Sequence, residues 1–283
     1  MTVVWAWADL GNHDLQTYNI KQYWLIMSVL SVRKFNPEWK RVFFVDQETY
    51  NFLDDKKWTN LWDEVNVIDF SDTEYGNLYD IKIYSWPKIY SYGLVDDDIL
   101  ILDTDIVFVK KFKIPDRSKM CGHYYDYIHN LKNNYDDKGT FNFRYVWKNE
   151  MINVLNELDR YDISLNYRPT EESICLIGSP IYVPKGLGKY ISKEVLEHIH
   201  EVETRGGLFS HELIGPTYYC IEEEYPIAAI GKRCVGLCSL NKNMYKHGFC
   251  YKCKVDTDHG FKIPETILGI PVYDMYIKEK TED

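Results

Sequence analysis

The stretch VDDDILILDTDIVFV, from Val95 to Val109, decides the fold because it encloses a short apolar strand between two acidic groups. Four apolar residues precede the triplet Asp103-Thr104-Asp105, and apolar residues resume directly after it. Short apolar strands that alternate with helices form mostly parallel sheets whose two faces are covered. Such sheets bind ligands at the carboxyl ends of their strands, so the triplet lies where a site is expected.

The residues on either side of this stretch alternate between strand and helix patterns. Before and within it, strands are predicted at 2–8, 41–45, 65–70 and 98–102, and helices at 23–35 and 86–93. After it, helices are predicted at 143–158 and 189–203, and strands at 173–178 and 180–183. The sequence contains no repeat and no linker. We therefore predict an α/β protein with a mostly parallel central sheet flanked by helices, in a single compact domain.

Charge and apolar content exclude several classes of function. The chain carries 43 acidic and 33 basic side chains, a net charge of −10, so its field repels polyanions and no nucleic-acid partner is expected. No run approaches the roughly 20 apolar residues of a membrane span. The first residues lack the cationic start and cleavage site of a secretory signal. We predict a cytoplasmic protein without a transmembrane segment.

The cysteines raise a separate question about metal binding. Seven cysteines in a chain of 283 residues fit reduced thiols better than a disulfide framework. Cys234, Cys238, Cys250 and Cys253 have a spacing close to that of a structural zinc site. The spacing is looser than the usual double C-x2-C pattern, so buried thiols remain the main interpretation.

The triplet itself predicts a site for a hard divalent cation. In an extended chain, residues i and i+2 point the same way, so Asp103 and Asp105 could converge on one cation. Two adjacent carboxylates repel each other unless a metal or hydrogen-bond donors compensate. Carboxylate oxygens favour Mg²⁺ or Mn²⁺, which keep open positions for substrate phosphates.

Three short motifs, ILDTDIVF, SWPKIYSYGL and KHGFCYK, give the chain a family resemblance. It resembles the nucleotide-sugar-dependent glycosyltransferases of the GT-A fold, a Rossmann-like architecture. The resemblance implies a nucleotide-sugar-binding half at 1–110 and an acceptor-binding half at 111–283. It implies Mn²⁺ or Mg²⁺ as cofactor and transfer of a hexose, pentose or deoxyhexose to a glycan or glycoconjugate. UDP is the commoner nucleotide in such enzymes, so a UDP-sugar is expected ahead of a GDP-sugar.

The resemblance also implies roles for residues near the triplet. Asp105 would be the direct metal ligand, and Asp103 would touch the ribose or the metal shell. Lys88 would reach the phosphates or the donor sugar. His247 would be the third metal ligand, with Lys252 neutralising the leaving diphosphate. His259, and a rival acidic triplet at 256–258, are alternatives for the metal site.

Two further pairs complete the predicted site. Trp7 could stack on the base and Asp9 could accept a hydrogen bond from it, although a core Trp and a turn Asp explain the same residues. His211 and Glu212 lie at a predicted helix start, and Glu212 could deprotonate the acceptor hydroxyl in an inverting transfer. Interaction with the helix dipole explains Glu212 as well. The pair Glu171 and Glu172 is a weaker alternative for the base.

Two other classes of protein fit parts of the pattern. Haloacid-dehalogenase-type phosphohydrolases also place D-x-D after an apolar strand, with Asp103 as nucleophile and Asp136 and Asp137 as the later acidic pair. Their motif usually lies near the N-terminus, whereas about a hundred residues precede it here. A GT-A-like domain that binds a glycan without transferring sugar is the non-enzymatic alternative.

Overall fold

A seven-stranded sheet forms the centre of the protein. The computed structural model describes residues 1–8, 15, 19–76, 86–122, 124–125, 167, 175–176, 179–206, 225–241, 243–247, 265 and 268–277. Within them, the sheet has the strand order β10-β6-β9-β4-β1-β2-β3. Its strands are β1 (Thr2–Trp7), β2 (Lys40–Val45), β3 (Glu64–Val67), β4 (Ile99–Ile101), β6 (Met120–Gly122), β9 (Ile181–Val183) and β10 (Leu237–Ser239).

Most neighbouring strands of this sheet are parallel. β1 pairs in parallel with β2 and β4, β2 with β3, and β10 with β6. β9 is the exception, because it runs antiparallel to β4 and β6. Two small sheets lie beside the large one: β5 (Ile106–Phe108) pairs with β11 (Tyr245–His247), and β7 (Tyr124–Tyr125) pairs with β8 (Cys175–Leu176). The predicted mostly parallel α/β fold is confirmed.

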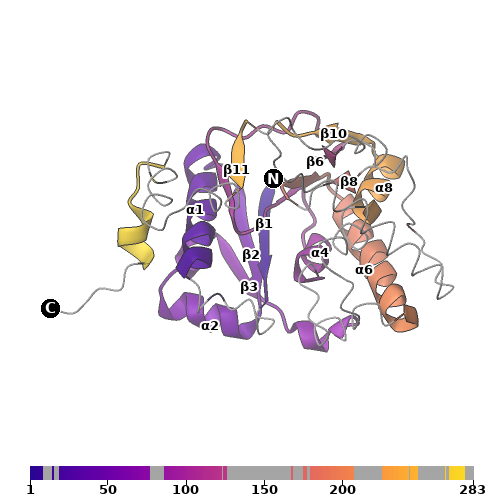
Figure 1. Ribbon diagram of the computed structural model, residues 1–283, viewed down its shortest axis with the longest axis horizontal. Helices are drawn as coiled ribbons and strands as arrows, with labels where there is room; N and C mark the ends of the chain where they lie inside the picture. Colours follow the sequence, from indigo (N-terminus) through magenta and orange to yellow (C-terminus); the bar gives the residue numbers. More distant parts are fainter. Residues whose placement is uncertain are drawn as a thin grey trace, which may run out of the picture.

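Helices cover both faces of the sheet (Figure 1). α1 (Asn19–Phe35) and the π-helical turn η6 (Tyr273–Ile277) lie on one side, and α4 (Trp86–Tyr92), α6 (Leu187–Gly206) and α8 (Tyr225–Cys234) lie on the other. The other helices of the described residues are α2 (Gln47–Asp55) and the short η1 (Thr59–Leu61) and η2 (Phe70–Asp72). The predicted helices at 23–35, 86–93 and 189–203 correspond to α1, α4 and α6. The helix predicted at 143–158 lies outside the described residues.

The strands are apolar throughout because each contributes to two cores. In β1, Val3 and Trp5 pack with α1, whereas Val4 packs with the helices of the opposite face. In β4, Leu100 joins the first core, and its neighbours Ile99 and Ile101 join the second. Successive side chains of a strand point to opposite faces, so a sheet covered on both sides needs continuous apolar runs.

α1 is buried on more of its circumference than its periodicity predicts. The predicted stripe of Tyr23, Met27 and Leu30 is buried, but the intervening positions are buried as well. Among them is Ser31, whose hydroxyl accepts a hydrogen bond from Phe108 N at 2.9 Å and donates to a backbone carbonyl of its own helix. The helix therefore holds β5 through polar contacts as well as apolar packing.

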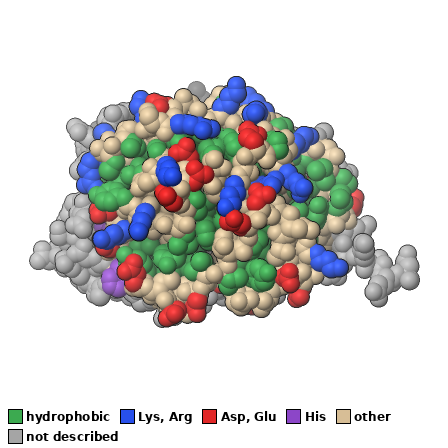
Figure 2. Space-filling model, turned by 180° about the vertical axis from the view of Figure 1, so that it is seen from behind, with side chains coloured by type: hydrophobic (Ala, Val, Ile, Leu, Met, Phe, Trp, Pro, Cys, Tyr) green, Lys and Arg blue, Asp and Glu red, His purple; other side chains and the backbone are tan. Residues whose placement is uncertain are grey.

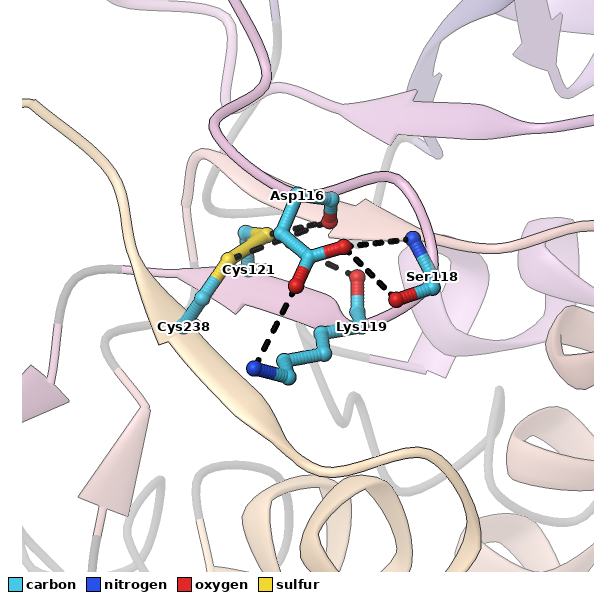
Figure 3. A network of polar contacts seen from close by, with 5 residues as sticks. All are labelled: Asp116, Ser118, Lys119, Cys121 and Cys238. Carbon is cyan, nitrogen blue, oxygen red and sulfur yellow. Dashed lines mark hydrogen bonds and ion pairs between the residues drawn. A yellow bond between two sulfur atoms is a disulfide. The ribbon is translucent and has the colours of Figure 1, made fainter.

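A disulfide joins the edge strand β10 to β6. Cys121 and Cys238 are direct partners in the parallel register, with their Cα atoms 4.6 Å apart and a disulfide between them. Figure 3 shows the bond beside the turn that begins at Asp116, where the Asp116 carboxylate accepts hydrogen bonds from the backbone and hydroxyl of Ser118. These bonds, with a contribution from Lys119, hold the pKa of Asp116 below its usual value.

This disulfide corrects the expectation that the cysteines are reduced thiols. Cys238 is bonded to Cys121 and is not available to the zinc set considered with Cys234, Cys250 and Cys253. Cys234 is an exposed free thiol at the end of α8. The side chains of Cys250 and Cys253 lie outside the described residues.

The surface carries charges of both signs. On the face shown in Figure 2, basic and acidic side chains are interspersed with apolar ones. None of the helices within the described ranges is long and apolar enough to cross a membrane.

Candidate functional site

The carboxyl ends of β1 and β4 meet where the strand order of the sheet reverses. From β1 the chain moves outward to β2 and β3 on one side, and it returns to β4 on the other side. β1 and β4 are parallel, with Val4 opposite Ile101, so both strands end at the same edge. Open α/β sheets bind ligands at such a switch point. Trp7 ends β1 and Asp103 follows β4 closely, so both residues lie at this edge.

The acidic triplet forms a tight turn between β4 and β5. The Ile106 N–H donates to the Asp103 carbonyl at 3.2 Å, which closes a four-residue turn. The expectation that the triplet is extended, with its carboxylates aligned by strand alternation, is therefore wrong. β4 already ends at Ile101, before the turn that holds Asp103 and Asp105. Both residues are partly exposed.

Lys88 contacts the first carboxylate of the triplet. Its Nζ lies 3.1 Å from Asp103 Oδ1, with 14% of the Lys88 side chain and 34% of the Asp103 side chain exposed. Lys88 lies in the first turn of α4, where Pro87 is suited to a helix start. The ring of Trp86 stacks on Tyr90 at a centroid distance of 5.2 Å and anchors the helix against the core. α4 thus holds the predicted donor-binding lysine against the triplet.

This arrangement suits a hard divalent cation. The triplet offers two carboxylates, whose oxygens Mg²⁺ and Mn²⁺ prefer, and the Asp103 carboxylate already pairs with a cation, the Lys88 ammonium. In the described parts of the chain, no group of three or more His, Cys, Asp or Glu side chains could hold a metal. Asp103 and Asp105 would therefore supply two ligands, and the other ligands would come from a further residue, substrate or water.

β11 brings the backbone of His247 close to the triplet. β11 pairs antiparallel with β5, and His247 lies opposite Ile106, the residue after Asp105. Directly opposite residues in an antiparallel pair have Cα atoms about 4.5–5.5 Å apart. Residues far apart in sequence thus meet at the triplet, although the role of His247 as a ligand stays a prediction.

Trp7 lies at the same edge of the sheet in a cationic environment. Lys21 Nζ, from α1, is 5.6 Å from the centre of the Trp7 ring. The indole Nε1 of Trp7 is buried and has no hydrogen-bond partner among the described residues. The ring is partly buried and packs against the core that contains α1. This placement is compatible with both interpretations of Trp7, as a base-stacking residue and as a core residue.

Sequence reasoning missed Ser179, which contacts the triplet directly. The Asp103 N–H donates to Ser179 Oγ at 2.6 Å, and Ser179 is only 2% exposed. The available signal was the Ser-Pro dipeptide at the start of the predicted strand 180–183, because proline at a strand start interrupts regular backbone pairing.

Several predicted site residues lie outside the described residues, and their roles stay predictions. They are Asp9, His211, Glu212 and Lys252, together with the alternatives Glu171, Glu172, His259, Asp136 and Asp137.

A surface hollow of about 620 Å³ lies away from this edge. It is lined by residues of β2 and β3 and by the segment 94–97, and it includes Thr2 and Lys40, the first residues of their strands. The hollow thus reaches the amino ends of β1 and β2, opposite to the end at which the triplet lies. Its lining offers no link to the acidic turn.

The fold and the site define an α/β protein with an acidic turn at the switch point of its sheet. Among solved structures, the chain is similar to the PaToxG glycosyltransferase, with 13% identity, 95% of this chain and 78% of that chain covered, and a TM-score of 0.42. It is similar to the galactosyltransferase LgtC in complex with donor and acceptor sugar analogues, with 13% identity, coverage of 93% and 82%, and a TM-score of 0.42. It is also similar to mouse xyloside xylosyltransferase 1, with 9% identity, coverage of 85% and 84%, and a TM-score of 0.41. No protein-family model and no curated protein sequence matches the chain.

Proposed function

We propose that the protein is a metal-dependent glycosyltransferase of the GT-A fold. It would move a sugar from a nucleoside diphosphate donor to a hydroxyl of a glycan or glycoconjugate. We expect the donor to be a UDP-sugar rather than a GDP-sugar. The observation that carries the proposal is the acidic turn at the switch point, where Lys88 Nζ lies 3.1 Å from Asp103 Oδ1. Carboxylates that hold a metal and a cation beside them form a complementary site for a diphosphate.

The proposed chemistry divides the work among residues at the edge of the sheet. Asp103 and Asp105 would hold Mn²⁺ or Mg²⁺, with His247 as the third protein ligand. When bound, the metal supplies Lewis-acid stabilisation of the charge that develops on the leaving diphosphate. Lys88 would exchange its contact with Asp103 for one with the phosphates or the donor sugar. Its ammonium lies 3.1 Å from Asp103 Oδ1, at the edge where the diphosphate would bind.

Donor base and acceptor would be bound by the remaining predicted residues. Trp7 would stack on the base beside Asp9, since β1 ends at the same edge as the triplet. Lys252 would add positive charge near the diphosphate. Glu212, next to His211, would take the proton from the acceptor hydroxyl if the transfer inverts configuration. The transferred group would be a hexose, pentose or deoxyhexose.

The cellular location is a separate part of the proposal. The sequence predicts a cytoplasmic protein, but glutathione and thioredoxin keep cytosolic thiols reduced. The Cys121–Cys238 disulfide therefore favours an oxidising compartment. In a cytoplasmic protein, the same pair would be thiols.

A comparison of two product assays tests the proposed reaction. With Mn²⁺ and a panel of UDP- and GDP-sugars, we expect slow release of nucleoside diphosphate, because water can take the place of the acceptor hydroxyl. EDTA should abolish this release. With Mg²⁺ and p-nitrophenyl phosphate, we expect no release of inorganic phosphate.

The alternatives give different results in the same assays. A haloacid-dehalogenase-type enzyme would release phosphate from the monoester and form a phosphorylated Asp103. A glycan-binding domain without activity would release neither product. Either outcome would contradict the proposed transfer.

A further inference from the structure

The backbone of Asp103 has an unusual partner at the end of β4. Leu102 N–H donates to Val4 of β1 at 2.9 Å. Alternate N–H groups of a strand point to opposite neighbours, so the Asp103 N–H points toward β9. It donates there to Ser179 Oγ at 2.6 Å, and the same hydroxyl lies 3.5 Å from the Ile101 carbonyl oxygen, to which it donates.

The hydroxyl of Ser179 extends the β4–β9 ladder beyond its last backbone pair. The register of these strands ends with Ile101 opposite Ile181. The residue just before β9, toward the triplet, is Pro180, which has no N–H to donate. Ser179 supplies a side-chain contact where regular pairing stops, and it does so at the first residue of the acidic turn.

We propose that Ser179 is a positioning residue for the metal site. By fixing the backbone of Asp103, its hydroxyl sets where the acidic turn begins and where the Asp103 carboxylate meets Lys88. This inference rests on the proposed function, since it assigns Ser179 a role in metal and donor binding. Hydrogen bonds behind a metal ligand fix its orientation, and here the bond acts through the backbone of Asp103.

The test compares three variants by a readout that does not depend on activity. Ser179→Ala removes the acceptor, and Ser179→Thr keeps the hydroxyl. Ser192→Ala is the matched control, because Ser192 is also a buried serine that bonds a backbone carbonyl, that of Tyr90, but it has no contact with the triplet. Mn²⁺ affinity is measured by electron paramagnetic resonance, alone and with a fixed concentration of UDP, and the melting temperature is measured in EDTA.

We expect Ser179→Ala to weaken Mn²⁺ binding about 10- to 100-fold, the usual effect of losing an outer-shell partner. Ser179→Thr should restore most of the affinity, and Ser192→Ala should bind Mn²⁺ as the parent does. A purely structural role for Ser179 would instead lower the melting temperature in EDTA and leave the Mn²⁺ affinity unchanged. That result would overturn the inference.

Two further outcomes separate this inference from the proposed function. If Ser179→Ala does not fold, Ser179→Cys replaces it, because a thiol keeps a group at the same position but is a weak acceptor. Parent-like Mn²⁺ affinity of Ser179→Cys would then overturn the positioning role and leave the proposed function standing. A parent protein that binds no Mn²⁺ with or without UDP would overturn the proposed function, and the role of Ser179 with it.

Discussion

Lys88 and Asp103 form an ion pair that contributes little to folding. Both side chains are partly exposed, and solvent screens such pairs so that they contribute about 0–1 kcal/mol to folding. The pair places a cation at the acidic turn. On donor binding, the ammonium would become a partner of the diphosphate or the sugar.

Replacing Lys88 should therefore affect donor binding more than folding. We expect Lys88→Ala to weaken UDP-sugar binding about 10- to 100-fold at saturating Mn²⁺, since charged hydrogen bonds contribute about 1.5–3 kcal/mol. Calorimetric titration measures this change. Lys193→Ala is the control, because Lys193 is an exposed lysine on α6 that pairs with Glu197. If Lys88→Ala binds donor as tightly as the parent, the ion pair of Lys88 with Asp103 has only a structural role.

At the scale of elements, the chain after β10 links the disulfide to the acidic turn. β10 is an edge strand whose described sheet partner is β6, and Cys121 and Cys238 join the two strands covalently. Residues 240–244 then lead to β11, where Met244 O accepts a hydrogen bond from Val109 N at 3.0 Å. The disulfide thus fixes the start of the segment that carries His247 to β5.

Loss of this disulfide should destabilise the protein without removing its fold. The bond closes a loop with a sequence separation of 117, and native disulfides typically contribute about 2–4 kcal/mol. We expect Cys121→Ala/Cys238→Ala to lose about this much free energy of unfolding in urea. Cys234→Ala, which removes an exposed free thiol, should change little. If iodoacetamide labels Cys121 and Cys238 in the denatured, non-reduced protein, the pair is not bonded.

The sheet shows which elements the sequence could predict. β1, β2 and β4 follow from apolar runs that are buried on both faces, and α4 follows from Pro87 and Gly93 at its two ends. The antiparallel direction of β9 could not be predicted, because a short apolar run carries no signal for the direction of its partner. The Cys121–Cys238 pair depends on β6 and β10 being neighbours, which local patterns do not encode.

At the scale of the whole molecule, local sequence predicts some features of the candidate site but not others. The position of Asp103 and Asp105 at the end of a buried strand follows from the apolar residues around them. Their arrangement in a turn, and the contact with Ser179, depend on how β4 meets β9. The placement of His247 opposite Ile106 depends on the pairing of β11 with β5, which joins segments far apart in the chain. Spacing along the sequence cannot reveal such contacts.

The architecture brings these groups together where the large sheet, at the end of β4, meets the small β5–β11 sheet. β1–β4 come from residues 1–110, and β6, β9 and β10 come from residues 111–283. Ser179 and His247, both from the second half, meet the triplet from the first half. We therefore expect donor binding to depend on the complete sheet rather than on residues 1–110 by themselves.

Metal-dependent binding of UDP to the parent and to Asp105→Asn tests the central claim most directly. A ligand that binds only the native state at 100 times its Kd stabilises it by about 2.7 kcal/mol and raises its melting temperature. We predict that Mn²⁺ with UDP raises the melting temperature of the parent and that UDP with EDTA does not. In EDTA, Asp105→Asn should have a melting temperature close to that of the parent. With Mn²⁺ and UDP, its melting temperature should not rise. An equal rise in both proteins, or no rise in the parent, would contradict the account.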